Sequence, residues 1–308
     1  MDQVFPPSIV ILGPTASGKT RLACHVAFEL QGGVISADSR QVYHGLDIGT
    51  GKDLGEYRVN GRPIPYYLLD YVRPGAPYDV AQFQADFYAL LTDFPDQAAI
   101  VCGGSGLYLQ AIIQGYTHFQ YPVLPMLRAE LSTQSYEDLH KRWTPPADFP
   151  VKVDVSTQKR LIRGFEMWEN WKRGIELKAY PAWEPILFGL DLPREVRRQR
   201  ITARLDVRLN EGLVDEVEGL LRQGVSGEWL RRLGLEYAWV MRWLAGELTY
   251  IEFRSGLEVA IHQMAKRQMT FFRSMEKKGA QIHWLDGQLP VEKLLSEIKN
   301  NIPQHLFP

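Results

Sequence analysis

Short apolar runs and amphipathic segments alternate along the first third of the chain. Four runs rich in Ile, Val, Leu, Ala and Tyr predict buried strands, and the segments between them follow the 3.6-residue period of helices. The expected strands span residues 8–12, 34–37, 66–70 and 98–102, and the expected helices span residues 19–30, 79–91 and 107–114. This alternation is typical of an α/β fold with a parallel sheet flanked by helices.

The rest of the chain follows mainly helical patterns. Residues 121–185 are helical and irregular and contain seven prolines, which predicts an inserted helical subdomain. The later elements are an expected strand at 186–190, one long helix over 194–222, helices over 236–245 and 249–277, and a last strand at 281–285. We therefore expect an α/β core of residues 1–120 and 186–308, and a helical insertion of residues 121–185.

Composition adds a few limits. A hydrophobic fraction of 45% in 308 residues is enough for a substantial core. No run reaches the length of a membrane span and no export signal is expected at the N-terminus, so we expect a cytoplasmic protein. We also expect a monomer. Cys24 and Cys102 are too few for a disulfide framework, and we expect both in the core. Basic residues gather after residue 120, where they suit either phosphate backbones or solvated helix faces.

A complete phosphate loop of the form G-x-x-x-x-G-K-[ST] lies between the first strand and the first helix. It consists of Gly13, Pro14, Thr15, Ala16, Ser17, Gly18, Lys19 and Thr20. In such a loop the backbone N–H groups and the positive end of the helix dipole converge on a polyphosphate. Lys19 would add a positive charge, and the Thr20 hydroxyl would bind Mg²⁺, the expected cofactor. The loop predicts a phosphate-loop NTPase-like sheet.

Two more polar segments follow expected strands, where ligands bind in open parallel sheets. Asp38 follows the second strand and would take a proton from a substrate or hold the metal, although a structural cap is an equally good interpretation. Ser105 lies in the glycine-rich segment 103–106 after the fourth strand, which is either a ligand contact or an ordinary turn. That strand ends in Cys102 and not in the Asp that holds Mg²⁺ in NTPases, which disfavours nucleotide hydrolysis. The residues suit departure of a whole diphosphate from carbon instead.

Linked motifs lie at residues 13–20, 35–43, 45–50, 103–108, 160–163, 212–217 and 265–270. Together they resemble the motifs of the tRNA dimethylallyltransferases, also called tRNA isopentenyltransferases, and the resemblance covers about residues 8–286. It implies transfer of a dimethylallyl group from dimethylallyl diphosphate to N6 of the adenosine 3′ of a tRNA anticodon. It also implies that Asp38 is the general base, that the phosphate loop with Mg²⁺ holds the diphosphate, and that Ser105 donates to the leaving group. Arg200 and Arg204 are our candidates for neutralising the diphosphate.

The resemblance implies a tRNA site as well, in which the target base leaves its stack and the insertion grips the anticodon stem-loop. The residues expected to contact tRNA are Asp38, Ser39, Arg40, Gln41, Arg160, Arg163, Arg231, Arg232, Arg267 and Gln268. The chain departs from the family pattern at residues 66–70, which follow an extra stretch at 57–62, and at residues 233–237. No zinc-finger tail is expected, so the bacterial type is the better match.

Two other functions are compatible with the phosphate loop. A small-metabolite kinase would use the same loop to transfer phosphate from ATP. A prenyltransferase that acts on free adenine nucleotides would not need a basic helical insertion.

Overall fold

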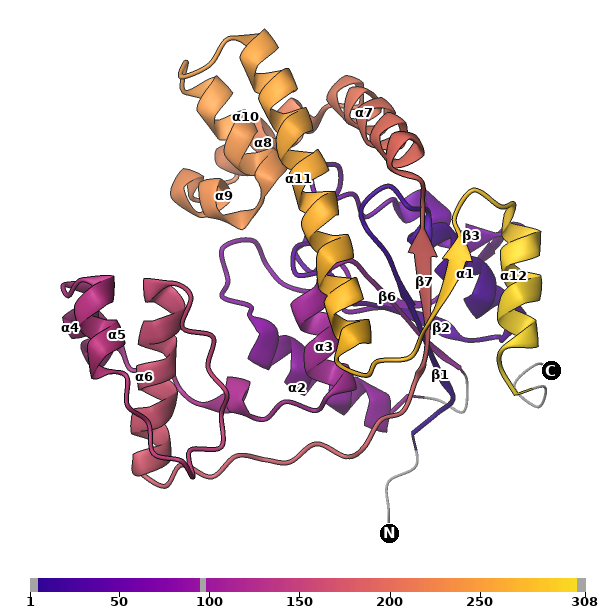
Figure 1. Ribbon diagram of the computed structural model, residues 1–308. Helices are drawn as coiled ribbons and strands as arrows, with labels where there is room; N and C mark the ends of the chain where they lie inside the picture. Colours follow the sequence, from indigo (N-terminus) through magenta and orange to yellow (C-terminus); the bar gives the residue numbers. More distant parts are fainter. Residues whose placement is uncertain (1–4, 95–97, 304–308) are drawn as a thin grey trace. The chain divides into compact units, whose positions relative to one another are not determined.

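The fold is described from a computed structural model in which residues 5–94 and 98–303 are placed (Figure 1). The chain divides into two compact units. One unit combines the residues up to Ile113 with those from Trp183 onward, and the other spans Gln114–Ala182. The insertion predicted from the sequence, residues 121–185, begins later than the second unit and also ends slightly later.

The first unit is built on a six-stranded sheet with the order β5-β2-β6-β1-β7-β8. All five neighbouring pairs run parallel, as the alternation of strands and helices predicts. The strands are β1 Ser8–Leu12, β2 Gly33–Ser36, β5 Tyr66–Tyr67, β6 Ala99–Gly103, β7 Ile186–Asp191 and β8 Ile282–Asp286. β1, β2 and β6 are buried along their whole length because helices cover both faces of the sheet. Strands β3 Arg58–Val59 and β4 Arg62–Pro63 form a separate hairpin.

Figure 1 shows α1 and α12 on one side of this sheet and α2 and α3 on the other. These helices span Lys19–Glu29, Val291–Asn300, Val80–Thr92 and Gly106–Ile113. Apolar side chains of α1 and α12 form one core with the sheet, and the buried thiols of Cys24 and Cys102 lie in it as free cysteines, as expected. Asp79 caps α2 by accepting hydrogen bonds from the N–H groups of Ala81 and Gln82.

Two sequence predictions were wrong in detail. The long helix expected over 194–222 is two helices, α7 Arg194–Asn210 and α8 Leu213–Arg222, because Gly212 between them has a φ of +100°. The strand expected over 66–70 ends at Tyr67, because Leu68 and Asp70 both have positive φ and cannot continue an extended strand.

The remaining helices of the first unit follow α8. They are α9 Gly227–Leu233, α10 Leu235–Leu244 and α11 Tyr250–Lys277. A capping box of Thr249 and Glu252 starts α11, and helices α7 to α11 share a second apolar core. No helix in residues 5–94 and 98–303 combines the length and the apolar character that a membrane crossing requires.

The second unit contains α4 Pro125–Ser132, α5 Tyr136–Arg142 and α6 Gln158–Lys172, with the short 3₁₀ helix η2 at His118–Gln120. Its small core contains Leu131, Leu139, Leu161, Ile162 and Phe165. Trp168 packs against this core and Trp171 against the ring of Phe149, so both have structural roles in this unit.

Candidate active site

The phosphate loop has the shape that anion binding requires. It leaves β1 at Leu12 and enters α1 at Lys19, and it turns through positive φ angles at Ala16 and Gly18. A Cβ at Gly13 would lie 2.8 Å from the hydroxyl oxygen of Ser17, so the loop closes tightly there. In the described part of the chain no side chain caps the start of α1. Its first N–H groups are therefore left to bind an anion.

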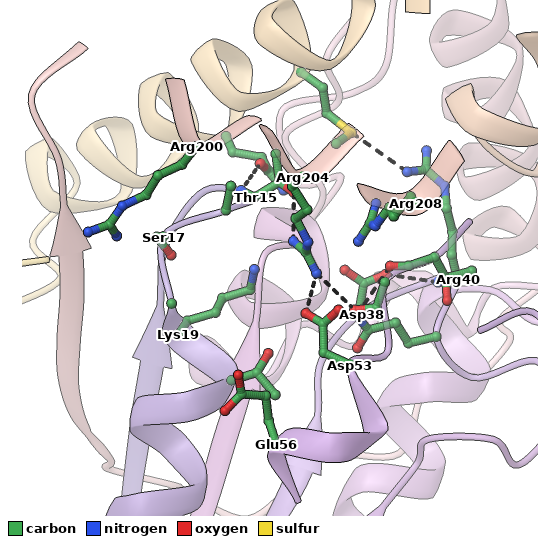
Figure 2. Close-up of a pocket in the computed structure, with 18 of the residues that line it drawn as sticks. Thr15, Ser17, Lys19, Asp38, Arg40, Asp53, Glu56, Arg200, Arg204 and Arg208 are labelled. Atoms are coloured by element: carbon green, nitrogen blue, oxygen red, sulfur yellow. Dashed lines mark hydrogen bonds and ion pairs between the residues drawn. The ribbon is translucent and has the colours of Figure 1, made fainter. Parts of the chain in front are cut away.

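The loop forms one wall of a cavity of about 360 Å³ at the carboxyl ends of β1, β2 and β6. Most of the residues that the sequence singled out in the first unit line this cavity. They are Thr15, Ala16, Ser17, Gly18, Lys19, Thr20, Asp38, Arg40, Gln41, Ser105, Arg200, Arg204 and Gln268. The cavity therefore joins a phosphate-binding loop to a carboxylate and a hydroxyl from neighbouring strand ends. Figure 2 shows Lys19 of this loop and Asp38 among the residues that line the cavity.

Asp38 and Ser105 are held close together by backbone contacts. The carboxylate of Asp38 accepts a hydrogen bond of 3.0 Å from the N–H of Arg40, which orients it. The hydroxyl of Ser105 accepts one of 3.2 Å from the N–H of Ser39. A Cβ at Gly103 would lie 2.3 Å from the carbonyl oxygen of Ala37, so the two strand ends can approach only because this residue is glycine. Glycine at position 103 is therefore required for this close approach, and the glycine-rich segment is more than an ordinary turn.

Lys19 lies in the loop with its amino group 3.5 Å from the carbonyl oxygen of Pro14. Burial lowers the pKa of this amino group, and the charges of Asp38 and Asp53 act in the opposite direction. A bound diphosphate would strengthen the second effect and stabilise the charged form of Lys19.

Three arginines of α7, Arg200, Arg204 and Arg208, line the cavity because they are spaced by one helical turn and so lie on one face of the helix. Arg204 reaches furthest: it contacts the hydroxyl of Thr15 at 3.5 Å and the carbonyl oxygen of Gly51 at 3.4 Å, and it forms an ion pair with Asp53. Arg200 donates to the carbonyl oxygen of Gly287 at 3.2 Å. Arg208 is buried and pairs with Glu236 at 3.7 Å.

Gln268 on α11 bridges two loops of the site. Its Oε1 accepts a hydrogen bond of 2.9 Å from the N–H of Thr15, and its Nε2 donates one of 3.0 Å to the carbonyl oxygen of Gly104. The sequence suggested that Gln268 contacts tRNA. In this structure its amide is engaged inside the protein, and nothing in the local sequence indicates a partner 253 residues away.

Arg40 and Gln41 also make contacts within the protein. Arg40 donates through Nε to the carbonyl oxygen of Leu233 at 2.8 Å, which ties the Asp38 loop to the end of α9. Gln41 donates to the carbonyl oxygens of Thr50 and Gly51 at 3.3 and 2.8 Å. Ser39 lies between these residues and Asp38, next to Ser105.

The other arginines expected to contact tRNA lie outside the cavity. Arg231 pairs with Glu247 at 3.0 Å, Arg232 pairs with Glu228 at 2.6 Å, and Arg267 is exposed on α11. In the second unit, Arg160 is exposed and pairs with Asp154, whereas Arg163 is largely covered by the backbone around Tyr121. Their contacts with tRNA stay predictions.

Sequence reasoning missed Asp53, Glu56 and Arg208, all of which line the cavity. Asp53 and Glu56 come just after the motif at 45–50, and Arg208 belongs to the arginine-rich helix pattern. That pattern was a usable signal for Arg208, since it lies one turn beyond Arg204.

The residues present are compatible with Mg²⁺. Residues 5–94 and 98–303 contain no group of three or more His, Cys, Asp or Glu side chains arranged to hold a metal ion. Mg²⁺ does not need such a group when it binds phosphate oxygens and water together with one or two protein oxygens. Thr20 and Asp38 both line the cavity that the phosphates would enter.

A parallel sheet with a phosphate loop after its central strand β1 defines a protein of the phosphate-loop class. Its residues 41–275 match the sequence profile of the family described as IPP transferase. The chain is 44% identical over 299 residues to tRNA dimethylallyltransferase 2 of Bacteroides fragilis, covering 96% of this chain and 98% of the relative. It is 45% identical over 295 residues to the protein of the same name from Phocaeicola vulgatus, covering 95% and 96%.

Among solved structures, the chain resembles the full-length tRNA isopentenylpyrophosphate transferase of Bacillus halodurans. The TM-score is 0.70 at 30% identity, and the match covers 97% of this chain and 96% of the other. These matches extend over nearly all of the sequence. The chain belongs to the IPP transferase family.

Proposed function

We propose that this protein is a tRNA dimethylallyltransferase. It transfers a dimethylallyl group from dimethylallyl diphosphate to N6 of the adenosine 3′ of a tRNA anticodon and releases diphosphate. Relatives named tRNA dimethylallyltransferase match almost the whole chain and support this activity. The observation that carries the proposal is the single cavity in which the phosphate loop faces Asp38 and Ser105.

In this reaction the N6 amine attacks C1 of the dimethylallyl group, the bond from C1 to oxygen breaks, and its electron pair goes to the diphosphate. The N6 proton moves to Asp38, whose carboxylate is oriented by the N–H of Arg40. An amine conjugated to a purine is a weak nucleophile, so a positioned base contributes about 100-fold to 10,000-fold to the rate. Ser105 donates its hydroxyl proton in a hydrogen bond to the bridging oxygen of the leaving group.

The negative charge that develops on the diphosphate is stabilised by the loop N–H groups, by Lys19 and by Arg204. Mg²⁺ held by the Thr20 hydroxyl would act as a Lewis acid on the diphosphate oxygens. Each of these groups lines the cavity before a ligand enters, so little reorganisation is needed when the charge develops.

The acceptor adenine must leave its stack to reach the cavity, because N6 is covered while the base is stacked in the anticodon loop. Residues 38–41 lie on the Asp38 side of the cavity and would contact the extruded base. Exposed cations such as Arg160, Arg232 and Arg267 would contact phosphates of the anticodon stem-loop. We further propose that the protein acts as a monomer in the cytoplasm.

The test is incubation of the purified protein with dimethylallyl diphosphate, Mg²⁺ and an unmodified tRNA that carries adenosine 3′ of its anticodon. Mass spectrometry of the digested nucleosides should show one dimethylallyl group on adenosine. A matched tRNA with guanosine at that position should stay unmodified. Prenylation of AMP in preference to tRNA would favour the nucleotide prenyltransferase, and phosphate transfer from labelled ATP without prenyl transfer would favour the kinase. Either result would refute the proposal.

A further inference from the structure

Asp53 and Arg204 form an ion pair beside the phosphate loop. The same guanidinium contacts the carbonyl oxygen of Gly51 at 3.4 Å and the hydroxyl of Thr15 at 3.5 Å. The side chain of Arg204 is 25% exposed and that of Asp53 is 39% exposed, so a ligand in the cavity can reach both. Figure 2 shows Lys19, Asp53 and Arg204 pointing into the same space.

The loop that carries Asp53 is firmly held. Lys52, the preceding residue, is fully buried and donates to the carboxylates of Asp47 and Asp70 at 2.6 and 2.5 Å. Gly51 packs so closely against α7 that a Cβ there would lie 1.6 Å from Nη2 of Arg208. Asp53 itself has the left-handed φ of 50°, which non-glycine residues adopt rarely. The backbone thus fixes the position of the carboxylate, whereas the long side chain of Arg204 can change partner.

The carboxylate of Asp53 pairs with Arg204 of α7 and also influences Lys19 of the phosphate loop. Burial has the largest influence on the pKa of the Lys19 amino group and lowers it; among the smaller influences the charge of Arg204 also lowers this pKa, and the charge of Asp53 raises it. An incoming diphosphate carries several negative charges and binds arginine through two parallel hydrogen bonds. It therefore competes with Asp53 for Arg204, and the carboxylate repels it at short range.

We propose that Asp53 is the counter-ion of Arg204 while no diphosphate is bound. The ion pair breaks when the donor binds, because Arg204 then pairs with the diphosphate, and it re-forms when diphosphate leaves. This inference rests on the proposed function and describes how its diphosphate site is regulated. Asp53 acts through Arg204 and is a positioning residue. Because Asp53 competes with diphosphate for Arg204, the unaltered site binds diphosphate more weakly than its cations alone would, and this favours product release.

Glu56 provides a matched control. It lines the same cavity three residues further on, and within residues 5–94 and 98–303 it forms no ion pair with Arg204. Asp53→Asn and Glu56→Gln each remove one negative charge from the cavity wall. Only Asp53→Asn also frees Arg204. Asparagine tolerates the left-handed conformation, so this variant should fold.

The experiment is isothermal titration of inorganic pyrophosphate with Mg²⁺ into the full-length protein, its single variants and the double variant of Asp53→Asn with Arg204→Ala. We expect Asp53→Asn to tighten binding by about twofold to fivefold, in line with the release of a partly exposed ion pair. Glu56→Gln should change it by less than about twofold, as expected for a more distant screened charge. In the Arg204→Ala background, Asp53→Asn should add no more than Glu56→Gln does.

Three results would overturn the exchange. Asp53→Asn could weaken pyrophosphate binding, or it could change binding by the same amount as Glu56→Gln. Asp53→Asn could also tighten binding fully in the Arg204→Ala background. The transfer assay gives a second measurement: the KM for dimethylallyl diphosphate should fall in Asp53→Asn, whereas a damaged site would raise it. Tight pyrophosphate binding by the unaltered protein together with equal effects of the two single variants would refute the exchange and leave the proposed function standing. Absence of any pyrophosphate binding by the unaltered protein would refute both.

Discussion

The side-chain oxygen Oε1 of Gln268 accepts a hydrogen bond of 2.9 Å from the backbone N–H of Thr15. The two residues are 253 positions apart in the sequence. Because the other end of the amide donates to the carbonyl oxygen of Gly104, α11 holds the phosphate loop and the Ser105 loop at a fixed separation. The geometry of the cavity therefore depends on a helix that contributes none of the proposed catalytic groups.

Replacing Gln268 tests this bridge. Gln268→Ala should weaken pyrophosphate binding by about tenfold and lower the free energy of unfolding by about 1–2 kcal/mol, because two hydrogen bonds to the loops are lost. Gln268→Glu keeps an acceptor for the Thr15 N–H but places a negative charge against the Gly104 carbonyl oxygen, so it should weaken binding further. Calorimetry and thermal unfolding measure both effects. Unchanged pyrophosphate affinity with weaker tRNA binding would show instead that Gln268 is a tRNA contact.

Asp38→Asn should separate catalysis from binding. Asparagine can still accept the hydrogen bond from the N–H of Arg40, so the loop should keep its shape, but it cannot take the proton from N6. We expect the rate of transfer to fall by about 100-fold to 10,000-fold, the range for loss of a general base. Pyrophosphate affinity, measured by calorimetry, should stay the same or rise slightly because a negative charge is removed. Activity close to that of the unaltered protein would exclude Asp38 as the base.

The sequence predicted the site residues best where each of them directly follows a strand that the sequence also predicts. The phosphate loop, Asp38 and Ser105 each follow directly from the end of a strand whose apolar pattern is readable, and parallel strands bring those ends to one edge of the sheet. Placing the strands was therefore almost enough to predict that these residues line one cavity.

Contacts between distant segments could not be predicted in this way. Asp53 meets Arg204 across 151 residues, and the role of Gln268 depends on how α11 crosses the sheet. The break at Gly212 was missed because the apolar pattern continues on both sides of it, and only a backbone angle ends the helix. Asp70 was assigned to a strand, whereas its positive φ turns its carboxylate toward Lys52.

The ion pair of Lys52 with Asp70 makes stability depend on pH. Burial by itself would raise the pKa of Asp70, but the hydrogen bond and the charge of Lys52, followed by those of His44, lower the pKa on balance. A carboxyl group with a lowered pKa in the folded state stabilises the fold above its unfolded pKa of about 4 and loses this effect as the pH falls through the folded value.

Asp70→Asn should therefore destabilise the protein near neutral pH by about 1–2 kcal/mol, since Asp47 still accepts a hydrogen bond from Lys52. The difference from the unaltered protein should shrink as the pH falls below about 4. Urea unfolding over this pH range measures it. A difference that stays constant down to the lowest pH would contradict the assignment of this stabilisation to the charge of Asp70.

Arg163 and Arg160 on α6 should behave differently when each is replaced by alanine. Arg163 donates to the carbonyl oxygen of Tyr121 at 2.6 Å and pairs with the fully buried Glu166 at 3.2 Å. Arg128 still pairs with Glu166 at 2.6 Å when Arg163 is replaced, so Arg163→Ala should destabilise the second unit by about 1–2 kcal/mol. Arg160 is 59% exposed and pairs with Asp154, so Arg160→Ala should lower the free energy of unfolding by less than about 1 kcal/mol.

Arg160→Ala should also weaken tRNA binding, and it should reduce the slope of the tRNA affinity against salt concentration by about 1 if Arg160 contacts a phosphate. Thermal unfolding and filter binding over a range of salt concentrations measure these effects. Normal unfolding of Arg163→Ala with weakened tRNA binding would reverse the two roles and make Arg163 the direct tRNA contact.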